Sequence, residues 1–196
     1  MRTDQIILSG FGGQGIVAAG RTIAYAGMLD GLKVSMLPSY GPEMRGGFAN
    51  CHVILSESEI ASPLVSKADV VMAMSLPAVQ RFESWVKPGR ALIVDSHQIK
   101  QTSYRQDIQL IAIPATKLAM EVGNSKFANV VMIGAMLAVL SRPSLSAMEA
   151  AVRDLLPKEK QELFSLEMQA LGLGMNYLSQ EMQDLELGMN YLSQES

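Results

Sequence analysis

Three glycines near the N-terminus have the spacing of a phosphate-binding turn. Gly10, Gly12 and Gly15 follow the pattern G-x-G-x-x-G and lie between an apolar run at residues 5–8 and a helix-like stretch. In that context the first glycine allows a tight turn, the second lets the backbone approach a phosphate, and the third lets the helix pack closely. The N–H groups of residues 12–16 are then expected to point at an anion, helped by the helix dipole. The alternative is a tight crossover that binds no ligand.

A second glycine-containing segment follows the next predicted strand. In residues 38–53, PSYGPEMRGGFANCHV, the glycine–proline turn, Glu43, Arg45 and the Gly46–Gly47 pair would occupy the connection after that strand, at the carboxyl edge of the sheet where folds of this type bind ligands. Arg45 offers a planar fork of donors for a phosphate or a carboxylate. An ion pair between Arg45 and Glu43 that stiffens a surface loop is the alternative. The two segments together predict one binding site, with the candidate residues Gly10, Gly12, Gly13, Gln14, Gly15, Tyr40, Glu43, Arg45, Gly46 and Gly47.

A nicotinamide dinucleotide fits these glycines less well than another phosphate-bearing cofactor. Such a site normally has an acidic residue about 20 positions later, at the end of the second strand. Here that strand ends in SMLPSYGP, with Asp30 before it and Glu43 beyond it. A stand-alone NAD(P)-type oxidoreductase is therefore kept only as an alternative.

The remaining reactive side chains are sparse. Cys51 is the only cysteine, which rules out an internal disulfide and falls far short of the four ligands of an iron–sulfur cluster. It is expected to be a small buried residue rather than a nucleophile. His52 and His97 lack metal-ligand spacing, and Asp95 is expected to cap a turn. We predict no catalytic and no metal-ligating residue.

Apolar runs alternate with helical stretches along most of the chain. The runs typical of central parallel strands are residues 69–74, 91–96 and 108–114. Residues 48–56 alternate in polarity, which indicates a strand nearer an edge. One later helix has Ser146 and Glu149 at capping-box spacing. The repeated β-α-β pattern predicts a layered α/β domain with a mostly parallel sheet.

The C-terminal region contains a repeat. The nonapeptide LGMNYLSQE occupies residues 173–181 and again residues 187–195, fourteen positions later. This indicates a tandem duplication, so we predict a domain at residues 1–160 followed by a helical tail at residues 161–196. Each glycine in the repeat weakens a helix by about 1 kcal/mol relative to alanine, which leaves both an exposed tail and a docked helix open.

Composition excludes several function classes. The chain has 196 residues, of which 48% are hydrophobic, and a net charge of −3 without a polybasic cluster. We therefore expect no nucleic-acid and no membrane partner. The longest apolar run, residues 130–140, is shorter than the roughly 20 residues of a transmembrane helix. The N-terminus has no export-signal pattern, so a cytoplasmic location is expected.

Three stretches resemble a known family. They are SGFGGQGIVAAG, SYGPEMRGGFANCHVILS and IASPLVSKADVVMAM, and their order and spacing are similar to those of the gamma subunit, or gamma domain, of the 2-oxoacid:ferredoxin oxidoreductases. That family includes the pyruvate, 2-oxoglutarate, ketoisovalerate (branched-chain) and indolepyruvate enzymes. The resemblance covers most of residues 4–140 and implies a Rossmann-like three-layer domain.

The resemblance also implies a function. Members oxidatively decarboxylate a 2-oxoacid with coenzyme A to an acyl-CoA and carbon dioxide, and pass electrons to ferredoxin. Thiamine diphosphate and iron–sulfur clusters would lie on the alpha, beta and delta-type (ferredoxin-like) partner subunits. The gamma chain would contribute a partial coenzyme A site and subunit packing, and alone it would be inactive. A purely structural subunit is a further alternative.

Overall fold

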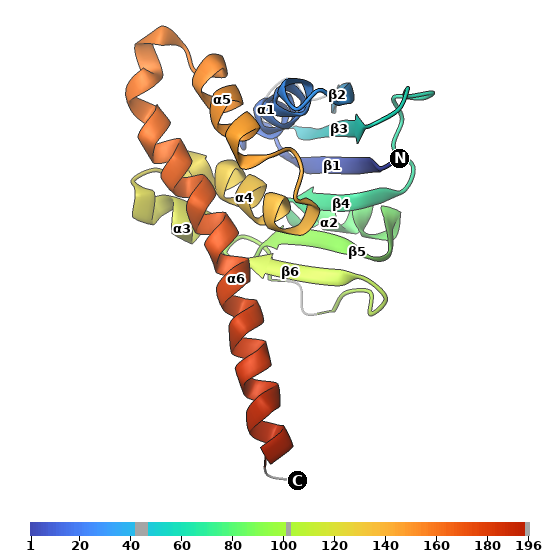
Figure 1. Cartoon of the computed structure of the whole chain (residues 1–196), viewed down its shortest axis with the longest axis vertical. Coiled ribbons are helices and arrows are strands. Elements are labelled where there is room, and N and C mark those ends of the chain that lie inside the picture. The colour runs from blue at the N-terminus through green and yellow to red at the C-terminus, as the bar shows by residue number, and fades with distance from the viewer. Residues whose placement is uncertain (42–46, 101–102, 195–196) are drawn as a thin grey trace.

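The computed structural model describes residues 1–41, 47–100 and 103–194, with the backbone alone from residue 181 onward. Within these residues, six strands form one sheet in the order β2-β3-β1-β4-β5-β6 (Figure 1). The strands are β1 (Thr3–Phe11), β2 (Lys33–Tyr40), β3 (Phe48–Ser56), β4 (Ala68–Ala73), β5 (Val86–Asp95) and β6 (Gln109–Ile113). β3 runs antiparallel to both neighbours, whereas β1, β4, β5 and β6 are parallel. The mostly parallel sheet is thus confirmed.

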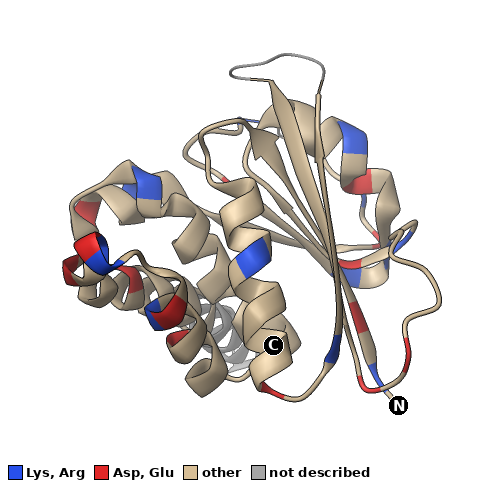
Figure 2. Ribbon diagram, turned by 90° about the horizontal axis from the view of Figure 1, so that it is seen from above, with Lys and Arg blue, Asp and Glu red and all other residues tan. Residues whose placement is uncertain are grey.

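Helices cover the two faces of the sheet unequally (Figure 2). The helices are α1 (Ile16–Leu29), α2 (Leu76–Phe82), α3 (Ala115–Val122), α4 (Ala128–Leu140), α5 (Leu145–Leu155) and α6 (Phe164–Gln194), with the short 3-10 helices η1 (Glu83–Trp85), η2 (Ser125–Phe127) and η3 (Lys158–Leu163). On one face α1 and α4 contact the strands, α5 packs on α1, and α6 packs on α4. The other face is covered by α2 and η1. The expected three-layer α/β architecture is therefore confirmed.

The central strands are apolar because both of their faces are covered. In β4 all six residues are buried. Val70 and Met72 belong to the core under α1 and α4, and Val71 and Ala73 to the core under α2. The expectation that β6 is also central is wrong, since it lies at the sheet edge and its Leu110 is 39% exposed. An apolar run indicates burial but does not indicate which strands pair with it.

The alternating strand β3 lies one position from the opposite edge. Its residues Ala49, Cys51, Val53 and Leu55 belong to the core under α1. Ile54 belongs to the core under α2, so the predicted two-faced pattern is confirmed. The edge itself is β2, in which Pro38 stands opposite Cys51. Proline is tolerated in an edge strand because it has no N–H group to donate to the ladder.

The start of α5 differs from the predicted capping box. Ser144, not Ser146, caps the helix, and its side chain accepts a hydrogen bond from the Ala147 N–H at 3.2 Å. The Asp30 carboxylate at the end of α1 accepts from the backbone N–H and the hydroxyl of Ser144. Glu149 instead forms an ion pair with Arg153. The capping residue is therefore determined by Asp30, which lies far from Ser144 in the sequence.

The first part of α6 is docked on the almost entirely buried helix α4. Two glycines face each other where the helices cross: a Cβ atom at Gly174 would overlap the carbonyl oxygen of Val131, and one at Gly134 would overlap that of Leu171. The backbones can therefore approach only because both positions lack side chains. Among the described residues, no helix is long and apolar enough to cross a membrane. The division of the chain at residue 160 stays a prediction.

Replacing Gly174 with alanine should destabilise the fold by about 2 kcal/mol, because the new methyl group forces two backbones apart. Gly172 is the matched control in the same helix, since a Cβ atom there meets no atom within 4 Å. Gly172→Ala should stabilise by about 0.5–1 kcal/mol through helix propensity. Urea unfolding of both variants measures the difference, and effects of the same sign would contradict the glycine-mediated helix packing.

Candidate functional site

The glycine turn connects β1 to α1 at the carboxyl edge of the parallel strands (Figure 1). Gly13 and Gly15 have φ angles of +95° and +74°, a conformation that side-chain-bearing residues rarely adopt. Gly15 is the N-cap of α1 and provides no side-chain cap, and the first turn of α1 contains no acidic residue. The positive end of the helix is therefore not neutralised by α1 itself.

The carboxamide of Gln14 fixes the shape of the turn. Its Oε1 atom accepts a hydrogen bond from the Phe11 N–H at 2.7 Å, and its Nε2 atom donates to the Met74 carbonyl at 2.9 Å. Gly10 must lack a side chain because a Cβ atom there would overlap Gln14 Oε1 and lie 3.1 Å from the Cβ of Met74. Gly10 thus serves close packing at the end of β1.

Asn129 holds the other end of the turn and was missed in the sequence. Its Nδ2 atom donates to the carbonyl of Gly15 at 3.2 Å from the second residue of α4. A Cβ atom at Gly15 would overlap this Nδ2 atom. The contact spans 114 positions, so no local pattern could reveal it.

The two predicted segments meet through their backbones. The Gly12 N–H donates to the Gly47 carbonyl at 2.7 Å. The expectation that the Gly12 N–H is free for an anion is therefore wrong, and the Gln14 N–H is likewise bonded, to the Phe11 carbonyl at 3.2 Å. Within the described part of the chain, the N–H groups of Gly13, Gly15 and Ile16 have no acceptor. Among the described residues of the turn, these three groups are the ones available to a ligand.

Only part of the second segment can be placed. Tyr40 ends β2 and is 68% exposed, and Gly47 directly precedes β3. Glu43, Arg45 and Gly46 lie outside the described residues, so their roles in the site stay predictions.

The sheet order also bears on dinucleotide binding. In a dinucleotide-binding fold the second strand lies beside the first and its end carries the acidic residue that binds ribose. Here the antiparallel β3 lies between β1 and β2, so the end of β2 is displaced by one strand. The β2 end carries Ser39 and Tyr40 rather than an acid. Strand order and sequence both disfavour a ribose clamp at this position.

Comparisons with known proteins identify the family. The profile of the pyruvate ferredoxin/flavodoxin oxidoreductase family matches residues 5–177. The chain belongs to this family. The resemblance drawn from the three sequence stretches is thereby confirmed.

Relatives of this oxidoreductase family member differ in length. The 2-oxoglutarate synthase subunit KorC of Methanothermobacter thermautotrophicus is 36% identical over 173 residues, which cover 85% of this chain and 92% of KorC. The ketoisovalerate oxidoreductase subunit VorA of Methanothermobacter marburgensis is 35% identical over 138 residues, which cover 70% of this chain but only 29% of VorA. The chain thus matches nearly all of one relative and less than a third of the other.

A solved structure supports the same assignment. The crystal structure of the keto/oxoacid ferredoxin oxidoreductase gamma subunit from Geobacter sulfurreducens is similar with a TM-score of 0.75 and 31% sequence identity. The similarity covers 88% of this chain and 96% of that one.

The other candidate side chains of this oxidoreductase family member have structural roles. Asp95 is buried and accepts hydrogen bonds from the His97 N–H and from both the N–H and the hydroxyl of Thr116, which join the end of β5 to the start of α3. This agrees with the expected turn cap. Among the described residues, no group of three His, Cys, Asp or Glu side chains could hold a metal ion.

Cys51 and His52 are placed on opposite faces of β3. Burial raises the pKa of the Cys51 thiol to about 11, so the reactive thiolate is scarce at neutral pH. His52 is half-buried with its ring edge-on to those of Phe82 and Trp85, and burial lowers its pKa. Its Nδ1 atom accepts from the Val65 N–H at 3.4 Å. Both residues therefore serve packing, as expected.

Cys51 should resist thiol reagents in the folded chain. At pH 8, well below the raised pKa, only about one thiol in a thousand is ionised, and the sulfur is also buried. The folded chain should react with a chromogenic disulfide at least about 100-fold more slowly than the urea-unfolded chain. Because the folded pKa exceeds the unfolded one, the contribution of Cys51 to stability should be lost only as the pH rises above about 8.5. Stoichiometric labelling of the native chain within minutes would contradict this role.

Proposed function

We propose that the chain is the gamma-type subunit of a 2-oxoacid:ferredoxin oxidoreductase and contributes part of the coenzyme A site. The observation that carries the proposal is the set of three N–H groups, on Gly13, Gly15 and Ile16, that have no acceptor among the described residues and lie at the N-terminus of α1 in a member of this family. Coenzyme A offers a diphosphate and a 3′-phosphate, which such a turn suits. Gly12 and Gly47 support the turn by their mutual hydrogen bond.

The rest of the reaction is assigned to partner subunits. The full enzyme converts a 2-oxoacid and coenzyme A into an acyl-CoA and carbon dioxide, and two electrons pass to ferredoxin. With one cysteine and no G-D-G motif followed by paired asparagines, this chain suits neither an iron–sulfur cluster nor a thiamine diphosphate magnesium site. We therefore assign these cofactors to alpha, beta and delta-type subunits. The chain alone should not oxidise 2-oxoacids.

Co-purification tests the assembly. A tagged chain isolated from its native cell should bring down a thiamine-dependent subunit and a ferredoxin-like subunit. Recovery of the chain without either partner would contradict the assignment, as would tight NAD(P) binding by the isolated chain.

The coenzyme A contact is tested by a charge placed at the turn. Gly13→Asp puts a carboxylate beside the phosphate site, and like-charge repulsion should raise the KM for coenzyme A of the assembled complex about tenfold, equivalent to roughly 1.4 kcal/mol. Gly31→Asp is the matched control at the far end of α1. Both glycines have a positive φ and meet no atom within 4 Å of an added Cβ.

The control Gly31→Asp should leave the KM for coenzyme A within about twofold of that of the unsubstituted complex. Neither variant should change the KM for the 2-oxoacid. An unchanged coenzyme A KM in an assembled Gly13→Asp complex would favour a purely structural role for the chain.

A further inference from the structure

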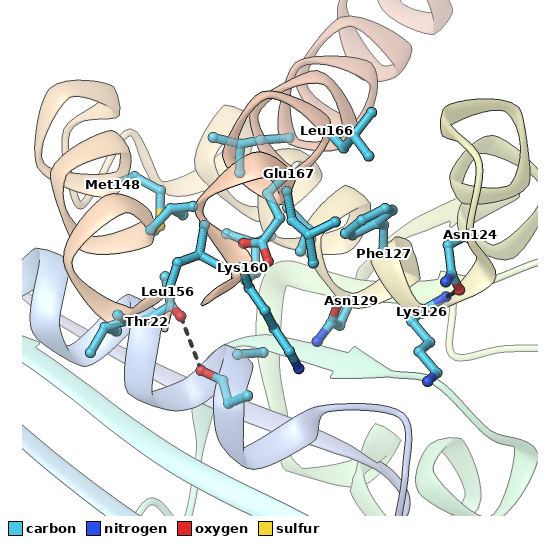
Figure 3. Close-up of a pocket in the computed structure, with 18 of the residues that line it drawn as sticks. Thr22, Asn124, Lys126, Phe127, Asn129, Met148, Leu156, Lys160, Leu166 and Glu167 are labelled. Atoms are coloured by element: carbon cyan, nitrogen blue, oxygen red, sulfur yellow. Dashed lines mark hydrogen bonds between the residues drawn. The ribbon is translucent and has the colours of Figure 1, made fainter. Parts of the chain in front are cut away.

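A cavity lies on the outer side of α1, away from the sheet. Its volume is about 520 Å³, within the range of small-molecule sites. It is open to solvent on one side and is lined by α1, residues 123–127 including η2, the start of α4, α5, η3 and the start of α6 (Figure 3). The cavity is built only from residues that the structure describes, and it is not used by the proposed coenzyme A contacts.

Most of the cavity wall is apolar. Phe127 and Ile133 line it from the α4 side, Met148 from α5, and Leu166 and Leu171 from α6. Such a wall favours the hydrocarbon part of a ligand. The apolar lining would therefore bind the hydrocarbon body of a ligand but would not fix the orientation of that ligand.

Three cationic side chains line the same cavity without ion-pair partners in the described part of the chain. Arg21 comes from α1, Lys126 from η2 and Lys160 from η3. In Figure 3 the side chains of Lys126 and Lys160 both extend toward the α1 side of the cavity. The chain as a whole carries a net charge of −3, so this group of unpaired cations is a local feature. One acidic side chain, the partly buried Glu167, also lines the cavity.

Asn129 adds an unsatisfied polar atom to the wall. The residue is 9% exposed, its Nδ2 atom is bonded to Gly15, and its Oδ1 atom has no hydrogen-bond partner in the described structure. A carboxylate has only acceptor oxygens and cannot donate to this atom, so Asn129 does not recognise an anion and the charged end of a ligand must lie away from it. The same residue thus joins the cavity to the glycine turn.

We propose that this cavity binds an amphipathic carboxylate, with the apolar body between α4, α5 and α6 and the carboxylate at Lys126 and Lys160. A ten-carbon chain with its carboxylate has twelve heavy atoms, which at about 30 Å³ each occupy about 360 Å³ and fit the cavity. The inference rests on the cavity and not on the coenzyme A contacts, so either can fail without the other.

Isothermal titration of the full chain with decanoate, below its micellar concentration, tests the proposal. Decanoate should bind saturably at one molecule per chain, and decanol, which has the same apolar body without the charge, should bind at least about fivefold more weakly. The Lys126→Gln, Lys160→Gln double variant should weaken decanoate binding about tenfold. Glu167→Gln, which removes the opposing charge, should strengthen it about threefold.

Lys158→Gln is the matched control, since Lys158 lies on η3 but does not line the cavity. It should leave decanoate affinity within about twofold. Saturable decanoate binding, with affinities of the variants in the predicted order, would support the site. Absence of saturable binding, equal binding of decanol, or equal weakening by Lys158→Gln would each overturn it. If the double variant fails to fold, Glu167→Gln still tests the proposal, because misfolding cannot strengthen decanoate binding.

Discussion

The two hydrogen bonds of the Gln14 carboxamide are the constraint on which the site depends. By bonding the Phe11 N–H and the Met74 carbonyl, this side chain joins the ends of β1 and β4. The turn therefore keeps its shape without using the N–H groups of Gly13 and Gly15. The backbone hydrogen bond from the Gln14 N–H to the Phe11 carbonyl also leaves these two donors unused among the described residues. Preorganised donors favour anion binding because no internal bonds must break first.

The strand order gives this turn its position. β1 lies where the chain turns from β2 and β3 on one side to β4, β5 and β6 on the other, and such switch points are where open α/β sheets bind ligands. The antiparallel β3 brings Gly47 next to Gly12, so both predicted segments meet there. Asn129 adds a third support from α4 through its hydrogen bond to the Gly15 carbonyl.

Local patterns in the sequence predicted the features that arise from neighbouring residues. The position of the glycine turn between β1 and α1, the apolar strand β4 and the two-faced strand β3 depend on spacing within ten or so positions, and these three predictions were correct. Features that depend on distant partners were wrong or missed. The free N–H group assigned to Gly12 is bonded to Gly47, the α5 cap is chosen by Asp30, and Asn129 contacts a residue 114 positions away. Edge placement of β6 likewise depends on strand pairing rather than on composition.

Amide chemical shifts of the ¹⁵N-labelled chain, recorded as coenzyme A is added, test the central claim most directly. Unpaired N–H groups that bind a phosphate should show the largest shifts at Gly13, Gly15 and Ile16. Gly31, at the other end of α1, should not move. Saturable shifts confined to other parts of the chain, or no shifts at millimolar coenzyme A, would contradict an anion-binding turn.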